Sequence, residues 1–234
     1  MTEVLLIPSF IADQAKETIP LYVMDQIRNC KVIFAENERT ARRFLKAMDP
    51  GFVIDDFEWH TIHKTEEEQW MPFQQAVKTG KNIAIISEAG CPGVADPGQY
   101  LVSLAQQMGC KVRPLVGPSS ILLALMASGM NGQQFEFVGY LPVDQQQRAK
   151  RIKELELHSS KNQSTKIFIE TPYRNEALWS SLLQHCLPDT SLCIAIDLTG
   201  ENEQIHTKTV SDWRKSGFSF QKLPAIFLLY SGKR

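Results

Sequence analysis

Three observations predict an α/β protein in which an N-terminal domain with a mostly parallel sheet precedes an α+β C-terminal domain with a mixed sheet. Before Gly129, short apolar runs alternate with segments of helical periodicity, a pattern typical of parallel strands covered by helices on both faces. After Gly129, strand-like runs follow with less helix between them. The polar residues 131–134 separate the two patterns. We therefore expect domains at residues 1–132 and 133–234.

Each apolar run of the N-terminal domain predicts a strand, and each segment with a period near 3.6 predicts a helix. The strands are expected at residues 4–8, 31–35, 52–57, 82–87 and 111–116. The helices are expected at residues 17–29, 38–48, 66–79, 99–108 and 120–127. This β-α alternation is the basis of the parallel-sheet prediction.

The C-terminal domain shows the same two signals in a less regular order. Strands are expected at residues 135–140, 165–170, 191–197, 204–210 and 225–230. Asp144 is a suitable cap for one helix, a second helix is expected at residues 175–187, and the polar residues 158–164 predict a loop.

Composition excludes several classes of protein. The 234 residues include 25 Lys plus Arg and 26 Asp plus Glu, a net charge of −1, and 43% hydrophobic residues. These values exclude long disorder, and they argue against non-specific binding to nucleic acid, which needs excess positive charge. With neither a signal peptide nor an apolar run of about 18 residues, we expect a cytoplasmic protein without a membrane span. The five cysteines form no CxxC pair, so we expect reduced thiols and no zinc site.

Two loops carry the signals of a binding site. Residues 87–98, SEAGCPGVADPG, follow the clearest strand, and ligands bind at the carboxyl ends of strands in open α/β sheets. Glu88 and Asp96 are candidates to accept hydrogen bonds from ribose hydroxyls or to balance a cation. The alternative is a long connection in which Asp96 caps the next helix. Residues 116–120, VGPSS, place hydroxyls and backbone N–H groups at a second strand-to-helix junction, although an ordinary Ser-capped helix would look the same.

Other motifs are absent or weak. The sequence has no GxGxxG, no GxxxxGK[ST] and no GxSxG, which excludes three common catalytic or nucleotide-binding motifs. His60 and His63 with nearby acids allow a metal site, but a solvated loop is favoured. The basic residues in 148–153 lie beside Glu154 and Glu156 and are interpreted as a solvated helix face, with phosphate binding as the alternative.

At these loops the sequence resembles the tetrapyrrole methylase superfamily of S-adenosylmethionine-dependent methyltransferases, closest to its 16S rRNA (cytidine-2′-O)-ribose methyltransferase branch. Residues 87–98 match a segment like SDAGTPxxxDPG, and PLVGPSS at 114–120 matches PLPGPSA. The resemblance continues with ALMASGM at 124–130, FEFVGYLP at 135–142 and ETPYR at 170–174. It implies the two-domain tetrapyrrole-methylase-like fold, with the cofactor in the cleft between the domains.

Three departures affect the acceptor side of the site. The family's PTPIGNL reads PSFIADQ at residues 8–14 and has lost its glycine at Ala12. The family's AEDTR reads Ala35-Glu36-Asn37-Glu38-Arg39, with Asn37 in the position of the aspartate and Glu38 in that of the threonine. In the ELTK-like segment, Gly200 replaces the lysine. These changes fall in segments expected to contact the methyl acceptor more than in the loops expected to bind the cofactor.

The resemblance also implies the site residues. The cofactor is S-adenosylmethionine, with S-adenosylhomocysteine as product, and no metal is required. The implied cofactor-binding residues are Pro8, Glu88, Ala89, Gly90, Asp96, Pro118, Ser119, Ser120, Tyr140, Leu141, Glu170, Thr171, Pro224 and Ala225. Glu36 is the candidate proton acceptor, and Arg39 is the candidate for orienting a substrate phosphate or carboxylate.

The expected assembly is a homodimer acting on rRNA or the small ribosomal subunit. Two alternatives remain open at this point: a methylase of a tetrapyrrole or another small molecule, and a cofactor-binding homologue that has lost transfer activity. Ala12, Asn37 and Gly200 are the residues that favour the second alternative.

Overall fold

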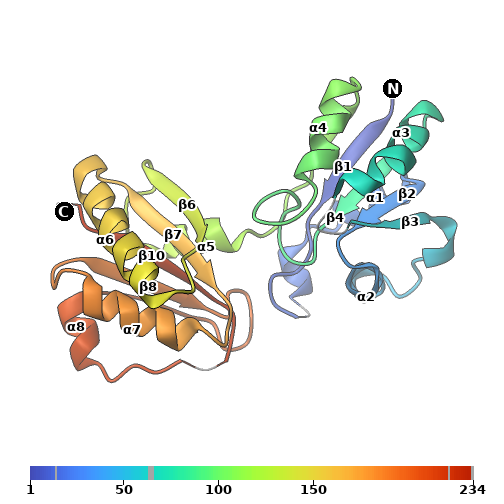
Figure 1. Ribbon diagram of the computed structural model, residues 1–234. Helices are drawn as coiled ribbons and strands as arrows, with labels where there is room; N and C mark the ends of the chain where they lie inside the picture. Colours follow the sequence, from blue (N-terminus) through green and yellow to red (C-terminus); the bar gives the residue numbers. More distant parts are fainter. Residues whose placement is uncertain (14, 63–65, 221, 233–234) are drawn as a thin grey trace. The chain divides into compact units, whose positions relative to one another are not determined.

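A computed structural model describes residues 1–13, 15–62, 66–220 and 222–232 of the chain. The chain divides into two compact units, Met1–Ser119 and Ser120–Arg234. Each unit contains one five-stranded sheet with its own helices (Figure 1). In the described residues, no helix combines the length and the apolar composition needed to cross a bilayer.

The N-terminal unit is built on a parallel sheet with the strand order β3-β2-β4-β1-β5. Its strands are β1 (Glu3–Ile7), β2 (Val32–Ala35), β3 (Glu58–Thr61), β4 (Ile83–Ile86) and β5 (Lys111–Pro114). Its α-helices are α1 (Tyr22–Arg28), α2 (Glu38–Met48), α3 (Trp70–Lys78) and α4 (Gln99–Gln107). Three short 3-10 helices complete the unit: η1 (Lys16–Thr18), η2 (Ile54–Asp56) and η3 (Glu66–Gln69).

Both faces of this sheet are buried. Alternate side chains of a strand point to opposite faces, so Ala84 and Ile86 of β4 join one core cluster and Ile83 and Ile85 join another. The first cluster contains side chains of α1 and α2, and the second contains side chains of α3 and α4. This burial explains why the strands are continuous apolar runs in the sequence.

The strand order creates a switch point between β2 and β4. The chain leaves β2 toward β3 on one side and leaves the adjacent β4 toward β5 on the other. Ligands of open α/β sheets bind at the carboxyl ends of two such strands. The segments that follow β2 and β4 are therefore the place to look for a site.

The C-terminal unit contains a mixed sheet with the order β6-β7-β10-β8-β9. Its strands are β6 (Phe135–Tyr140), β7 (Thr165–Glu170), β8 (Ser191–Ile196), β9 (Gln204–Thr209) and β10 (Ala225–Tyr230). Its helices are α5 (Ser120–Ser128), α6 (Gln145–Asn162), α7 (Asn175–His185) and α8 (Val210–Lys215). Strands β6 and β7 are parallel, whereas β10 is antiparallel to β7 and β8.

Aromatic side chains hold the helices of this unit on one face of the sheet. Trp179 of α7 packs edge-to-face on Trp213 of α8, with ring centroids 5.0 Å apart. It lies in one core cluster with Phe168 and Phe227 of the sheet and Ile152 of α6. Helix α5 instead contacts β8, β9 and β10.

The placement of α5 decides where the two units divide. The division lies between Ser119 and Ser120, whereas the sequence predicts a boundary between residues 132 and 133. Ile121, Ala124 and Leu125 of α5 are buried, and the helix packs on strands of the second sheet. An apolar helix that follows a β-α pattern carries no local sign of which sheet it will cover.

Three sequence predictions are wrong in detail. Residues 52–57 contain the turn η2 and not a strand, because β3 begins only at Glu58, where it pairs with Val32. The helix predicted at 17–29 is divided into the 3-10 helix η1 and α1, since the proline at position 20 holds the preceding residue in an extended conformation. The polar residues 158–164 continue α6 as far as Asn162 and do not form a separate loop.

Candidate active site

Glu36 and Glu88 meet at the switch point of the N-terminal sheet. Glu36 follows β2 and Glu88 follows β4, and the backbone N–H of Glu36 donates to the carbonyl of Ile86 at 3.2 Å. In return, the backbone N–H of Glu88 donates to Oε2 of Glu36 at 3.2 Å. Burial raises the pKa of Glu36, the Glu88 N–H partly offsets this rise, and the nearby Glu88 charge adds to it. Glu36 therefore holds a proton more tightly than an ordinary glutamate.

Asn37 connects this pair to α2. Its Oδ1 accepts from the N–H of Thr40 at 3.2 Å as the helix cap, and its Nδ2 donates to Oε1 of Glu88 at 3.1 Å. The hydroxyl of Thr40 donates to the same Glu88 oxygen at 3.2 Å. An aspartate at position 37 can cap the helix but has no N–H to donate. The asparagine that stands in place of the family's aspartate at position 37 thus forms a hydrogen bond to Glu88 that an aspartate could not donate.

Asp96 completes a group of three carboxylates. Burial raises its pKa to about 7, with further contributions from the charges of Glu36 and Glu88. The residue before it, Ala95, has a φ of 64°, which is a strained conformation for a non-glycine residue. The alternative that Asp96 caps the next helix is wrong, because the N-cap of α4 is Gly98.

The loops after β1, β4 and β5 are held together by backbone contacts. The N–H of Ser9 donates to the carbonyl of Gly90 at 2.9 Å, and the Ser9 hydroxyl donates to the carbonyl of Ser87 at 3.0 Å. The Cys91 thiol lies 3.3 Å from the carbonyl of Pro118. At Gly117 a Cβ atom would lie 2.1 Å from Cβ of Pro8. Only glycine at position 117 allows this approach to the segment after β1, whereas the contact between Cys91 and Pro118 joins the two loops singled out in the sequence.

A cavity of about 170 Å³ opens beside these loops. Its lining comes from the segment after β1, from α2 and from the start of the loop after β4. The lining residues are Ser9, Phe10, Ile11, Ala12, Asp13, Thr40, Arg43, Phe44, Ala47, Glu88 and Ala89. Residues 9–13 of the altered motif at 8–14 are therefore part of the wall of this cavity, and residue 14 lies outside the described residues.

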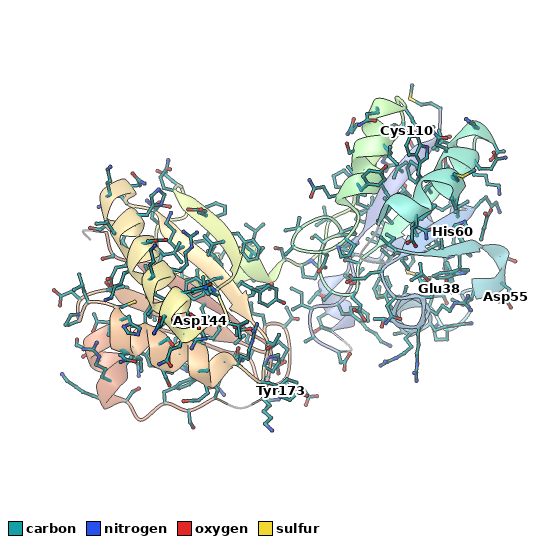
Figure 2. The ribbon with its side chains drawn as sticks, in the orientation of Figure 1. Glu38, Asp55, His60, Cys110, Asp144 and Tyr173 are labelled. Atoms are coloured by element: carbon teal, nitrogen blue, oxygen red, sulfur yellow. The ribbon has the colours of Figure 1, made fainter. Side chains whose placement is uncertain are left out.

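The pairing register of the strands places the predicted residues of the C-terminal unit at one end of its sheet, which is called its edge below. Tyr140 of β6 pairs with Ile169, the neighbour of Glu170 in β7. Glu170 pairs with Ala225 of β10, and Ala225 also pairs with Ile196 of β8. Leu141, Thr171 and Pro224 adjoin these positions in the chain, and Tyr173 is exposed in the turn after β7 (Figure 2).

Two polar atoms at this edge are buried without a hydrogen-bond partner within the described residues, Oδ1 of Asn175 and Oγ1 of Thr199. Nδ2 of Asn175 donates to the carbonyl of Leu223 at 3.0 Å. Thr199 has a φ of 66°, a rare conformation for a β-branched residue. Strain and unsatisfied polar atoms are frequent at ligand sites.

The predicted residues thus fall into two sets, one at the carboxyl ends of the parallel strands of the N-terminal unit and one at the end of the C-terminal sheet where β7 and β8 end and the antiparallel β10 begins. Ser119 and Ser120 are the exception, since the division between the units falls between them. Sequence reasoning missed Thr40 and Arg43, although both lie one helical turn from residues that it had named. It also missed the orphan atoms of Asn175 and Thr199, for which the sequence contains no signal.

The described residues include no group of three or more His, Cys, Asp or Glu side chains that is arranged to hold a metal ion. His60 stacks on Phe34, with ring centroids 4.8 Å apart, and its Nε2 lies 3.0 Å from Oε1 of Glu58. Figure 2 shows His60 in the N-terminal unit. His63, its predicted partner, lies outside the described residues.

The sequence profile of the family described as Tetrapyrrole (Corrin/Porphyrin) Methylases matches residues 15–213. The chain belongs to this family. The resemblance read from the sequence motifs is thereby confirmed.

Curated relatives of this family member carry the name ribosomal RNA small subunit methyltransferase I. The Bacillus subtilis protein is 28% identical over 84% of this chain and 64% of its own length. The Vibrio cholerae protein is 33% identical over 78% of this chain and 60% of its own length. The chain thus spans less than two thirds of the length of these relatives.

Solved structures of tetrapyrrole methylases confirm the fold class. Uroporphyrin-III C-methyl transferase from Thermus thermophilus, in complex with S-adenyl homocysteine, is 16% identical with a TM-score of 0.56, over 98% of this chain and 97% of that chain. The methyltransferase CobJ is 16% identical with a TM-score of 0.60, over 98% of each chain. At this identity the likeness concerns the fold alone.

Proposed function

We propose that this protein is an S-adenosylmethionine-dependent methyltransferase that methylates a ribose 2′-hydroxyl of small-subunit rRNA. Membership of the family and the names of the curated relatives support the reaction and the acceptor. The observation that carries the proposal is the position of Glu36, a half-buried carboxylate with a raised pKa at the switch point of the parallel sheet. A hydroxyl acceptor needs a proton acceptor at such a place.

The residues present fit the proposed cofactor, which supplies a methyl group on a positively charged sulfonium. Burial and the Glu88 charge raise the pKa of Glu36, and burial and the charges of Glu36 and Glu88 raise the pKa of Asp96. A cation near these carboxylates relieves their repulsion. The orphan oxygens of Asn175 and Thr199 are acceptors of the kind that amino and hydroxyl groups of a nucleoside satisfy. These observations support the residues that the sequence predicted as cofactor contacts in both units.

Glu36 has the role of general base in this proposal. Methylation of a hydroxyl releases a proton, and Oε1 of Glu36 is available to take it because the Glu88 N–H engages the other oxygen, Oε2. A carboxylate with a raised pKa is a stronger base near neutral pH than an ordinary one. Arg39, in the first turn of α2, orients a phosphate of the acceptor.

The remaining expectations belong to the same proposal. An rRNA acceptor implies action in the cytoplasm, and the family implies a homodimer. The net charge of −1 argues against binding through overall charge, so RNA recognition in this proposal depends on local positive groups.

The decisive experiment measures transfer of a labelled methyl group. Wild-type protein is incubated with labelled S-adenosylmethionine and one of three acceptors: small ribosomal subunits lacking the modification, total RNA, or a tetrapyrrole and small-molecule pool. We expect label in the small-subunit rRNA. Label in the small-molecule pool alone would establish the alternative acceptor. Thermal stabilisation by the cofactor without transfer to any acceptor would indicate a binding homologue.

Glu36→Gln separates the role of the base from cofactor binding. We expect the transfer rate to fall by about 100-fold or more, while stabilisation by S-adenosylmethionine persists. Glu38→Gln is the matched control, because the Glu38 carboxylate is engaged by Thr61 at 2.9 Å and by Arg42 at 3.2 Å and so performs a structural role. Wild-type transfer by the Glu36 variant would exclude this residue as the base.

A further inference from the structure

Two of the arginines of α2 have no partner among the described residues. Arg42 forms an ion pair with Glu38 at 3.2 Å (Glu38 is labelled in Figure 2) and lies over the Trp59 ring at 4.9 Å. Lys46 donates to the carbonyl of Pro50 at 3.0 Å. Arg39 and Arg43, in contrast, are exposed and form no ion pair or hydrogen bond in the described part of the chain. Because they are four residues apart, they are neighbours on one face of the helix.

Helix α2 concentrates positive charge within an acidic unit. Residues 1–119 contain 12 Lys or Arg and 15 Asp or Glu, a net charge of 12 − 15 = −3. Residues 38–48 alone contain four basic residues and one acidic residue, a net charge of 4 − 1 = +3. Like charges at this spacing destabilise an isolated helix, so the fold itself gains nothing from placing Arg39 and Arg43 together.

The cavity lies beside this basic face. Arg43 and Thr40 line it from α2, and Phe10 and Ile11 provide apolar wall. Glu88 also lines it, so the same cavity offers both a cation and a carboxylate. A free anion would meet repulsion from that carboxylate. A polynucleotide presents phosphates to arginine and hydroxyl or amino donors to carboxylates, which satisfies both.

We propose that Arg39 and Arg43 form a phosphate-binding pair that holds the backbone of the RNA acceptor at the mouth of this cavity. The inference rests on the proposed function and extends it to Arg43, which no motif of the sequence indicated. The planar guanidinium group suits phosphate, because it donates two parallel hydrogen bonds.

The test compares the binding of a fluorescein-labelled single-stranded RNA to variants of the full chain by fluorescence anisotropy at several salt concentrations. We expect Arg39→Gln combined with Arg43→Gln to weaken RNA binding by roughly tenfold. The slope of log K against log salt should become shallower by about 1.4, since each phosphate contact on a single strand contributes about 0.7. In methyl transfer, the KM for RNA should rise while the KM for S-adenosylmethionine stays unchanged.

Arg28→Gln is the control for a loss of positive charge elsewhere on the same unit. It removes one positive charge, against two in the double variant, from the C-terminal end of α1, where Arg28 pairs with Asp25 at 2.7 Å and Asp49 at 2.6 Å. We expect this variant to keep the wild-type affinity and salt slope. Glutamine is a good helix former, and circular dichroism checks that α2 is intact.

The outcomes distinguish this inference from the proposed function. If the wild type methylates RNA and the double variant keeps the wild-type salt slope and KM, the inference is wrong and the proposed function stands. If the wild type is stabilised by the cofactor but neither binds nor methylates RNA, both the inference and the RNA acceptor are wrong. An equal loss in the Arg28 variant would also overturn the inference, because overall charge would then explain the binding.

Discussion

Carboxylates at the ends of the strands have different surroundings in the two units. In the C-terminal unit, the side chain of Glu170 is 2% exposed and accepts from the N–H of Thr171 at 2.7 Å and from Nε of Arg174 at 2.9 Å. In the N-terminal unit, Asp96 lies near Glu36 and Glu88, and its pKa rises to about 7.

This difference indicates a division of tasks between the two edges. A buried carboxylate that accepts from a neighbouring backbone N–H and from a guanidinium group orients the surrounding chain. Carboxylates that repel one another destabilise the free protein, and they favour whatever brings a positive charge or a proton. We infer that the C-terminal edge is a rigid frame, whereas the N-terminal edge is adapted to a cationic ligand and to proton transfer.

The largest change in the free energy of unfolding is expected from Glu170→Ala, which tests whether the C-terminal edge is a rigid frame. Removing one partner of a buried pair leaves the other partner uncompensated. Because Arg174 is 34% exposed and can recover some hydration, we expect the free energy of unfolding to fall by about 3 kcal/mol, the low end of the range for such pairs. Urea denaturation of the full chain measures it. Glu170→Gln keeps an acceptor and should lose clearly less. Equal stability of the alanine variant and the wild type would contradict a framing role.

Asp96→Asn should change the free energy of unfolding in the opposite direction and stabilise the protein above neutral pH. The folded-state pKa of about 7 lies above the ordinary value of 3.8, so the folded state binds this proton more tightly than the unfolded state. The contribution of Asp96 to stability is therefore fully present below pH 4 and is lost as the pH rises through 7. The variant carries no charge, so we expect it to be more stable than the wild type at pH 8, by about 1 kcal/mol after solvent screening, and no more stable at pH 4.

Thermal midpoints across this pH range measure the effect of Asp96→Asn. Asp49→Asn is the control, because hydrogen bonding to Arg28 lowers the pKa of Asp49, and its variant should be less stable than the wild type at pH 8. A gain at pH 4 that equals the gain at pH 8 would show that the titration of Asp96 is not the cause.

The smallest effect is expected from Arg39→Gln. It removes one of two like charges four residues apart and should raise the free energy of unfolding by about 0.3 kcal/mol. Arg42→Gln on the same helix removes the ion pair with Glu38 and should lower it by a similar amount. A series of replicate urea curves resolves the difference in sign. Clear destabilisation by Arg39→Gln would mean that this arginine stabilises the fold. The contrast between a C-terminal edge that serves the fold and an N-terminal edge that serves a ligand would then be weaker.

Much of the fold could be predicted from local patterns. The helix at residues 38–48 and the strands at 135–140, 165–170 and 225–230 have the expected bounds, because apolar period and capping residues act over a few positions. The strand expected at residues 52–57 failed for a non-local reason. The partner strand β2 pairs with residues 58–61 and not with the apolar segment before them.

The candidate site was predictable in part. Glycine, proline and acidic residues after a strong strand marked the loop at 87–98, and the family motifs supplied Glu36 and the residues of the second unit. Neither source indicated the cavity that Arg43 lines or the unsatisfied oxygens of Asn175 and Thr199. Such features depend on which segments meet in space.

The sequence by itself determined the two kinds of sheet, most helices and strands, and the loops where a site is expected, since these depend on period and local chemistry. Only the tertiary structure decided that β2 lies beside β4, which brings the Glu88 N–H to Glu36 across 52 positions of the chain. It also decided that Asp96 is buried near those carboxylates and that Arg39 and Arg43 have no described partner. Charge and burial acquire their effect from neighbours that are distant in sequence, and strand order decides which neighbours those are.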